Sequence, residues 1–551
     1  MLIGPAYTRD MYPVLIIGAG PVGLALAGDL AWRGVRSLLI ERSDGTIEQP
    51  RMDMVGIRTM EFARRWGIVR DVETSPYPRD YPQDNIYVTA MNGWELGREH
   101  MPSMGEDKPP VQSPQKRERC PQDMFDPILR RFVERQGKTE LRYRTELLGF
   151  EQHADHITAR VRSLETGAEE TVEARYIVGC DGASSRVREI LGIPMVGTPV
   201  LTNTTNVIFR DPDYDKRHDK APGYRQIFIG PEGMWATIVA IDGKDRRRMS
   251  ITRAPREGLT HEQIGALIRR AIGRDDVPIE ILSVTNWIRR ELVAENYGAG
   301  RAFIAGDAAH VMSPTGGFGM NTGIADAVDL SWKLDALLQG WGGPELARSY
   351  TIERKPVAER AVRESSKNLK NMLSPGVNPA LCDDSREGEM TRDRVGAAFK
   401  EAMRNEWFTL GIHLGYRMDD SPIIAEDGTP RPPLETARYV PTARPGGRAP
   451  HVYLRDGRST LDLFGNGFVL LVLGGGDPKE DEIVDEFRAE AASSGMPLTV
   501  TALNEDAVTK AYGARYVLVR PDGNVAWRGH DVRKASAIVD RVRGAAPARV
   551  G

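Results

Sequence analysis

The sequence contains few cysteines, almost no excess charge and no long apolar run. Three cysteines in 551 residues are too few and too far apart for a zinc cluster or a disulfide framework, and the nine histidines are scattered, so we expect a reducing compartment and no metal site. The 74 basic and 77 acidic residues nearly cancel, which argues against nucleic acid or anionic membranes as partners. No run reaches the roughly eighteen apolar residues of a membrane span. We therefore expect a cytoplasmic protein.

A first glycine motif lies in residues 14–42, VLIIGAGPVGLALAGDLAWRGVRSLLIER. The apolar run 14–17 predicts a buried strand, and the glycines that follow fit G-x-G-x-x-G at the start of a helix over residues 22–33. Such a turn lets backbone N–H groups approach a pyrophosphate. Glu41 ends the next apolar run, where an acid accepts from ribose hydroxyls and repels a 2′-phosphate. The motif predicts an unphosphorylated adenosine cofactor, FAD or NAD.

A later motif, AFIAGDAAHVMSPTGGFGMNTG, favours FAD over NAD. A short strand over residues 302–305 leads into Asp307, and a glycine-rich loop then precedes a helix over residues 320–338. This loop brings backbone and a helix N-terminus against a flat ligand, as a flavin requires because its reduction leaves negative charge on the ring. We expect His310 to pack or form hydrogen bonds near the loop, without a catalytic role.

A second motif, GCDGASSRVR at residues 179–188, lies between the first motif and the third, which spans residues 302–323. With all three motifs, the chain resembles the FAD-dependent aromatic hydroxylases. These are single-component, group A flavoprotein monooxygenases, and the similarity is greatest to the branch of phenol, dichlorophenol and 3-(3-hydroxyphenyl)propionate hydroxylases. The resemblance implies an α/β fold: a Rossmann-like FAD-binding domain with an inserted antiparallel-sheet substrate domain and a C-terminal thioredoxin-like domain.

The resemblance also implies a set of cofactor-binding residues. Asp307 would bind the ribityl chain, Asp181 would serve both FAD and the nicotinamide cofactor, and Arg51 would lie near a mobile flavin ring as a candidate catalytic residue. Asp181 could instead cap the helix that begins near Ser184, and Arg51 could be a solvated surface residue. The implied FAD contacts are Gly18, Gly20, Gly23, Glu41, Arg42, Arg51, Gln122, Asp181, Arg188, Asp307, Pro314, Gly317, Gly319, Met320 and Asn321.

The activity implied by the resemblance is hydroxylation of a phenolic or related aromatic compound with NAD(P)H and O2 through a flavin C4a-hydroperoxide. A second G-x-G-x-x-G for NAD(P)H is absent, as in the family, and a homodimer is expected. Loss of a nitro or halo substituent during hydroxylation stays open. One alternative is a flavin-dependent halogenase, although GMWATI matches the tryptophan motif of halogenases only in part. A non-catalytic binding protein of this fold should have lost the glycines and Asp307, which are intact here.

The predicted domain organisation follows the order of the motifs. We expect the first part of the FAD-binding domain in residues 1–200 (81–115 adding strands to the substrate sheet), the substrate sheet in 201–290, the last FAD-binding part in 291–370, a helical segment and linker in 371–445 and the thioredoxin-like domain in 446–551. Candidate substrate contacts on the sheet are Tyr224, Gln226 and Trp235, although the two aromatics could be core residues.

The last hundred or so residues predict the element order β-α-β-β-β-α, with a hairpin turn at Pro521-Asp522-Gly523. No cysteine follows Cys382, so the C-x-x-C of thioredoxin chemistry is absent. We therefore expect a role in packing or dimerisation for this domain.

Overall fold

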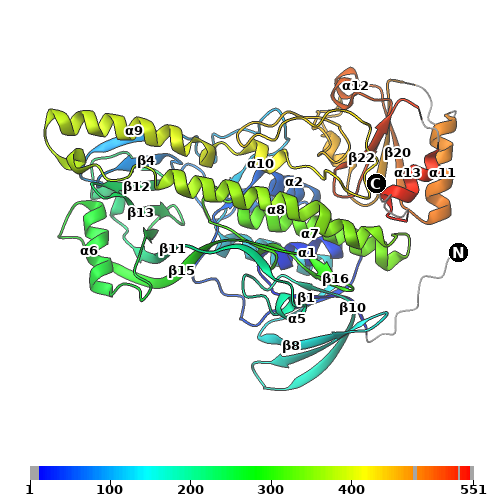
Figure 1. Ribbon diagram of the computed structural model, residues 1–551, viewed down its shortest axis with the longest axis horizontal. Coiled ribbons are helices and arrows are strands. Elements are labelled where there is room, and N and C mark those ends of the chain that lie inside the picture. The colour runs from blue at the N-terminus through cyan, green and yellow to red at the C-terminus, as the bar shows by residue number, and fades with distance from the viewer. Residues whose placement is uncertain (1–10, 476–480, 532–533, 546–551) are drawn as a thin grey trace.

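The computed structural model describes residues 11–475, 481–531 and 534–545, and three sheets of four or more strands organise them (Figure 1). The fold class predicted from the sequence is confirmed: an FAD-binding α/β domain, an inserted sheet and a smaller C-terminal α/β domain.

The first sheet carries the glycine motifs and has the order β16-β17-β10-β1-β2-β7, with β9 and β8 continuing from β10. Strands β17, β10, β1, β2 and β7 pair in parallel, while β16, β9 and β8 pair antiparallel with their neighbours. The strands are β1 (Tyr12–Ile17), β2 (Ser37–Ile40), β7 (Thr139–Arg142), β8 (Thr145–Gln152), β9 (Ile157–Ser163), β10 (Glu169–Gly179), β16 (Gly298–Ala299) and β17 (Ala302–Ile304). The apolar runs that predicted β1, β2 and β17 are fully buried except at the first residue of β1.

The helices of the FAD-binding domain lie between these strands and after them along the chain. They are α1 (Pro21–Trp32), α2 (Ile57–Trp66), α3 (Val69–Glu73), α4 (Gln122–Gln136), α5 (Arg186–Ile190), α7 (Phe318–Gln339) and α8 (Glu345–Met372). Helix α1 packs against both α4 and α7, and α7 packs against α8. The helix after the third motif begins at Phe318, two residues before the predicted start, because Gly317 adopts a left-handed conformation that ends the preceding loop.

The second sheet has the order β18-β15-β11-β14-β13-β12-β4-β5 and is antiparallel except where β12 pairs with β4. Its strands are β4 (Asn85–Val88), β5 (Glu95–Glu99), β11 (Met195–Arg210), β12 (Arg225–Gly230), β13 (Gly233–Ala240), β14 (Arg246–Thr252), β15 (Glu280–Ala294) and β18 (His310–Val311). Helix α6 (His261–Ile272) covers one face, and α9 (Arg386–Trp407) packs against the other. A two-stranded sheet of β3 (Met54–Val55) and β6 (Glu118–Arg119) and the short helix α10 (Leu410–Leu414) lie between the domains.

The C-terminal domain contains a helix that the sequence analysis missed. Helix α12 (Asp506–Tyr512) lies between the second and third strands, so the order is β-α-β-α-β-β-α. Its seven residues bury only Val508 and Tyr512 in the core, too few apolar positions to show a helical period. The other elements are β19 (Phe468–Leu473), β20 (Leu498–Leu503), β21 (Tyr516–Val519), β22 (Val525–Gly529), α11 (Glu482–Ser494) and α13 (Ala535–Val542), with the sheet order β20-β19-β21-β22.

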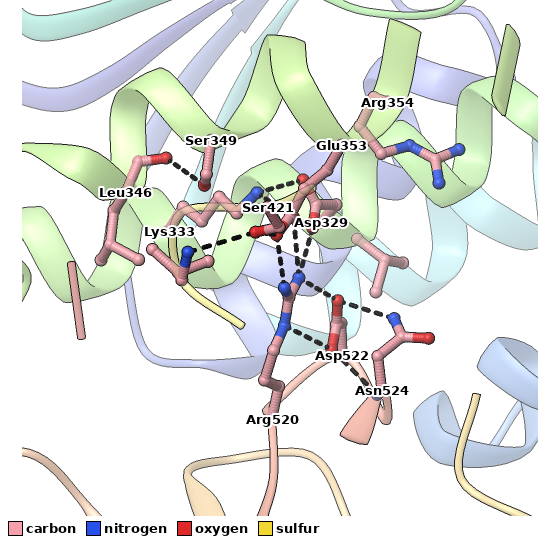
Figure 2. A network of polar contacts seen from close by, with 12 residues as sticks. Asp329, Lys333, Leu346, Ser349, Glu353, Arg354, Ser421, Arg520, Asp522 and Asn524 are labelled. Atoms are coloured by element: carbon pink, nitrogen blue, oxygen red, sulfur yellow. Dashed lines mark hydrogen bonds and ion pairs between the residues drawn. The ribbon is translucent and has the colours of Figure 1, made fainter. Parts of the chain in front are cut away.

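A buried ionic network joins the C-terminal domain to the FAD-binding domain (Figure 2). Arg520, just after β21, pairs with Glu353 of α8 at 2.6 Å and with Asp329 of α7 at 2.9 Å. Lys333 on α7 contacts Asp329 at 2.7 Å and Glu353 at 2.6 Å. Asp522 pairs with Arg520 at 2.6 Å. Because each charge is paired inside the protein, the C-terminal domain is fixed to the two helices.

Candidate cofactor and substrate site

The three glycine motifs meet at one edge of the first sheet. Ile17, Gly179 and Ile304 end β1, β10 and β17 at the same level of the parallel register. Backbone bonds hold the residues that follow: the Cys180 N–H donates to the Ile17 carbonyl at 2.8 Å, and the Ala305 N–H donates to the Gly179 carbonyl at 2.9 Å. The carboxyl edge of a parallel sheet is the usual ligand position in such folds, and all three motifs reach it here.

The glycines of the first motif are required for different reasons: two by close packing, and one by open space in front of a helix. A Cβ at Gly23 would lie 1.9 Å from the Gly18 carbonyl oxygen, and one at Gly18 would lie 2.5 Å from the Cys180 carbonyl oxygen. Both positions therefore require glycine for packing alone. A Cβ at Gly20 would meet nothing within 4 Å, and Gly20 precedes α1 without a side-chain cap. The open space and uncapped N–H groups at Gly20 fit a pyrophosphate.

Glu41 lies directly after β2, beside this turn. Its carboxylate accepts hydrogen bonds from the N–H of Ala19 at 2.9 Å and of Ser43 at 2.8 Å. Each oxygen has a further lone pair that can accept a ribose hydroxyl. Arg42 is exposed next to it.

Asp181 caps a helix and also keeps one carboxylate oxygen free of protein contacts. Its Oδ2 accepts from the N–H of Arg186 at 2.7 Å and of Val187 at 3.2 Å, at the start of α5. Its buried Oδ1 has no hydrogen-bond partner among the described residues. Arg188 donates to the carbonyls of Ala183 at 2.8 Å and Ala308 at 2.7 Å, and so ties the second motif to the third. The capping alternative is therefore realised, and Oδ1 stays available to a ligand.

Asp307 is solvent-accessible although protein surrounds it closely. This enclosure raises the pKa of its carboxyl, while His310 and Arg51 act in the opposite direction. The imidazole of His310 is buried and lies 2.7 Å from Asp326 through Nε2, so His310 has the packing role expected from the sequence. An accessible acid within a closed loop fits a hydroxyl-rich ribityl chain.

The loop before α7 presents backbone to its surroundings. The Gly317 N–H donates to the Pro314 carbonyl at 3.0 Å, and Gly317, at φ +67, has nothing within 4 Å of a Cβ position. The N-terminus of α7 has no side-chain cap. Asn321 is occupied: its Oδ1 accepts from the Gly56 N–H and the Thr59 hydroxyl, both at 2.7 Å, which fastens the loop to α2. Gly319 and Met320 are half-buried beside it.

Gln122 and Arg51 link the loop before β3 to the start of α4. The Gln122 Oε1 accepts from the Arg51 N–H at 3.1 Å, and its Nε2 donates to Asp126 Oδ2 at 3.1 Å. Burial raises the pKa of Asp126 to about 7. The Arg51 side chain is exposed.

Of the three predicted substrate contacts, Tyr224 alone lies toward the cofactor loops. Its hydroxyl donates to Asp53, and the guanidinium of Arg119 lies 3.5 Å from the centre of its ring. Trp235 instead packs with Phe228 in the core beneath α6. The guanidinium of Arg270, on that helix, lies 4.2 Å from the centre of its indole ring. The position of Trp235 contradicts a substrate contact, because the sheet separates it from the loops.

Gln226 is also on the α6 side. It lies opposite Ile86 and Ile238, both in the core beneath α6, and opposed residues on neighbouring strands share a face. Its amide donates to the Gly223 carbonyl at 2.8 Å, within its own turn. The predicted substrate contact of Gln226 is therefore corrected as well: its side chain lies on the face away from the cofactor loops.

The sequence analysis missed a group of residues on the face toward the cofactor loops. They are Asp53, Arg119, Arg225, Arg248, Trp287 and Arg289. Their signal in the sequence was weak: a run of three arginines at 246–248 places at least one on each face of a strand.

Other ligand types are not supported by the part of the chain that the structure describes. It shows no group of three or more side chains that could hold a metal ion. Among the same residues, no helix is both long and apolar enough to cross a membrane. The carboxylate acceptors of Asp181 and Asp307 and the open backbone positions at Gly20 and Gly317 together fit FAD.

Comparison with known proteins agrees with this site. Residues 11–365 match the family described as FAD binding domain, and residues 442–546 match the aromatic-ring hydroxylase C-terminal family. The 2,4-dichlorophenol 6-monooxygenase of Cupriavidus pinatubonensis is 30% identical over 94% of this chain and 92% of its own. The FAD-dependent monooxygenase apdD of Emericella nidulans is 31% identical over 96% and 89%.

Solved structures agree as well. RebC, the rebeccamycin biosynthetic enzyme, has a structure with reduced flavin that is 38% identical, covers 98% of this chain and 100% of its own, and has a TM-score of 0.89. Aklavinone-11 hydroxylase with FAD and aklavinone is 30% identical over the same shares, with a TM-score of 0.82. The chain belongs to the FAD-dependent aromatic-ring hydroxylase family, whose members are monooxygenases that use FAD and NAD(P)H.

Proposed function

We propose that this chain hydroxylates a phenolic or related aromatic ring held between the second sheet and the cofactor loops. The observation that carries the proposal is the hydrogen-bonded pair of Tyr224 and Asp53, which joins the sheet to the segment that follows Arg51. Relatives support a phenolic substrate: one is named for 2,4-dichlorophenol, another for 4-methyl-5-nitrocatechol.

Tyr224 and Asp53 are arranged to orient a substrate hydroxyl. Burial alone would raise the pKa of Asp53, but Arg119 and Arg248 beside it hold that pKa below its ordinary value. Burial raises the pKa of Tyr224, so its hydroxyl stays protonated and donates to the Asp53 carboxylate. A substrate phenol can then transfer its proton to the Tyr224 oxygen while the Tyr224 proton passes to the Asp53 carboxylate, and the resulting phenolate has more electron density on the ring carbons ortho and para to its oxygen.

The cofactor would be held by the residues at the carboxyl edge of the first sheet. The N-terminus of α1 after Gly20 would bind the pyrophosphate, Glu41 the ribose and Asp307 the ribityl chain. When bound, FAD would accept electrons from NAD(P)H and use them to activate O2. The uncapped N–H groups of α7 after Gly317 would stabilise negative charge on the ring, and Arg51 is the candidate to contact it.

The test is NAD(P)H oxidation by the purified protein with a panel of phenols, hydroxybenzoates and nitrophenols, with the yield of hydrogen peroxide measured in parallel. We expect one class of aromatic to accelerate NAD(P)H oxidation with little peroxide, and mass spectrometry to find one added oxygen in the product. NAD(P)H oxidation that no aromatic accelerates would contradict the proposal.

The quaternary structure and location are further predictions. We expect a homodimer, which light scattering after size exclusion would measure, and a cytoplasmic location, which fractionation would measure.

A further inference from the structure

Four arginines gather on the side of the second sheet that faces the cofactor loops. Arg225 comes from β12, Arg248 from β14 and Arg289 from β15, while Arg119 comes from β6. Arg119 and Arg289 are buried, and Arg225 and Arg248 are largely buried. Burying guanidinium groups is costly unless negative charge compensates them.

Carboxylates are fewer than arginines here. Asp53 pairs with Arg119 at 3.0 Å and with Arg248 at 3.4 Å, and also accepts from Tyr224. Glu406 of α9 pairs with Arg225 at 2.6 Å. Within the described residues these two acids form all the ion pairs of the four arginines, so the cluster carries excess positive charge.

Arg289 is the member without an acid. It is 4% exposed, and its Nε and Nη1 donate to the hydroxyls of Thr204 at 3.1 Å and Ser313 at 3.3 Å. Burial and repulsion from Arg225 and Arg248 lower its pKa to about 10, although Glu406 acts in the opposite direction, and the group is still charged at neutral pH. In the described part of the chain it has no carboxylate within ion-pair distance.

The cluster is tied to the segments that hold the cofactor. Ser313, which accepts from Arg289, immediately precedes Pro314 in the loop before α7. Arg248 donates to the carbonyl of Pro50 at 2.7 Å, immediately before Arg51. Arg289, which has no ion-pair partner among the described residues, therefore lies beside the loops that would hold the flavin.

An aromatic side chain completes this face. The indole of Trp287 lies opposite Thr204 on the neighbouring strand, with the Arg289 guanidinium 5.7 Å from the centre of its ring. Its buried N–H has no partner among the described residues. The Trp287 ring and its N–H donor lie next to a guanidinium that has no ion-pair partner among the described residues. Together they form a recognition surface for an aromatic acid.

We propose, on the basis of the proposed function, that the aromatic substrate of this enzyme carries a carboxylate, and that Arg289 binds it with Arg225 as its neighbour. Tyr224 and Asp53 then receive the hydroxyl end of the same molecule. Arg289 selects an aromatic acid over the neutral compound of the same shape.

The experiment compares matched probes on the FAD-loaded protein. Isothermal titration calorimetry measures the Kd of 6-hydroxy-2-naphthoate, whose hydroxyl and carboxylate lie at opposite ends, and of its methyl ester for the native protein, Arg289→Gln, Arg289→Lys and the control Arg210→Gln. Arg210 lies in the same sheet but is exposed and pairs with Asp245 and Glu280. Flavin content and Tm of each variant show whether it is folded.

We expect the native protein to bind the acid at least tenfold more tightly than the ester. Arg289→Gln should abolish this preference without weakening the ester, Arg289→Lys should keep part of it, and Arg210→Gln should keep all of it. Equal Kd values of acid and ester for the native protein would overturn the inference. So would an equal loss of affinity for acid and ester in Arg289→Gln.

The failure of the inference can be told apart from the failure of the proposed function. If only neutral phenols bind and accelerate NAD(P)H oxidation, the enzyme is a hydroxylase and the inferred carboxylate is wrong. If neither acids nor neutral phenols accelerate NAD(P)H oxidation, the proposed function itself is wrong and the inference falls with it.

Discussion

The guanidinium of Arg520 in the C-terminal domain lies 2.6 Å from the carboxylate of Glu353 on α8, although 167 residues separate them in the chain. Neighbouring charges share this buried site: Arg520 also contacts Asp329 and Asp522, and Lys333 binds both Asp329 and Glu353 (Figure 2). Because α7 begins at the cofactor loop, the domain without C-x-x-C stabilises the helix on which the site is built.

We expect Arg520→Met to destabilise the protein strongly. The change leaves Asp522 without its ion-pair partner and leaves Asp329 and Glu353 paired with Lys333 alone, and removing one partner of a buried ion pair costs about 3–5 kcal/mol. Chemical unfolding followed by tryptophan fluorescence measures the loss. The control is Arg515→Gln, whose exposed pair with Asp481 should contribute less than about 1 kcal/mol. Equal effects of the two changes would argue against the network.

Gly20 and Gly23 should respond differently to alanine. Gly23→Ala would place a Cβ 1.9 Å from the Gly18 carbonyl oxygen, so we expect a loss of about 1–3 kcal/mol in stability. Gly20→Ala meets nothing within 4 Å in the protein and should leave Tm unchanged, but it should weaken FAD binding about tenfold, or ~1.4 kcal/mol. Thermal unfolding of the FAD-free protein and flavin fluorescence titration separate the two. Unchanged FAD affinity in Gly20→Ala would remove this residue from the cofactor site.

Replacement of Asp307 should act on the cofactor. Asp307→Ala removes an acceptor from the enclosed loop, and we expect FAD affinity to fall by about 1–3 kcal/mol, the usual cost of an unpaired buried partner. Asp307→Asn keeps an acceptor and should lose less. Flavin content after dialysis measures both, and full retention of flavin with normal turnover in Asp307→Ala would contradict the ribityl role.

Tyr224→Phe should reduce turnover while keeping the cofactor. Loss of the hydroxyl removes the relay from substrate to Asp53, and positioned proton-transfer groups contribute about 100-fold or more to rate. Tyr214→Phe is the matched control, because the Tyr214 hydroxyl is buried on the α6 side without a described partner. Steady-state kcat and KM measure the effect, and we expect kcat to fall in Tyr224→Phe alone. The same kcat in both variants would exclude Tyr224 from the reaction.

The stability of the protein should fall at acid pH through Glu61. Burial would raise the pKa of this carboxyl, but Arg448 and Arg58 lower it from 4.5 to about 2. A lowered folded-state pKa stabilises the protein above pH 4.5, and this stability is lost as the pH falls toward 2. The shift corresponds to about 3 kcal/mol.

Urea unfolding between pH 7 and pH 2.5 measures the contribution of Glu61. Glu61→Gln should be less stable at pH 7 and lose less stability on acidification than the native protein. Parallel curves for the two proteins would mean that Arg448 and Arg58 do not stabilise the charged carboxyl.

The cofactor could be predicted from the sequence because its requirements are local, and the fold class followed from the family resemblance that the motifs carry. Gly18 and Gly23 leave no room for a Cβ, Glu41 follows directly on its strand, and the apolar runs of β1 and β2 lie in an interior that covers both faces. Each of these features is set by a few neighbouring residues, so the spacing of the motifs was sufficient to predict FAD.

Which residues face the substrate could not be predicted from the sequence, because packing between distant segments sets it. Every residue of β13 is buried, and all but the first of β12, so no alternation of polar and apolar side chains marks the face toward the cofactor. Helix α6 packs on the opposite side of the sheet and buries Trp235 in the core there. Arg289 lies on the other side, beside the cofactor loop. The partners of Arg289 and Arg520 come from distant segments, and contacts of this kind leave no periodic pattern in the sequence.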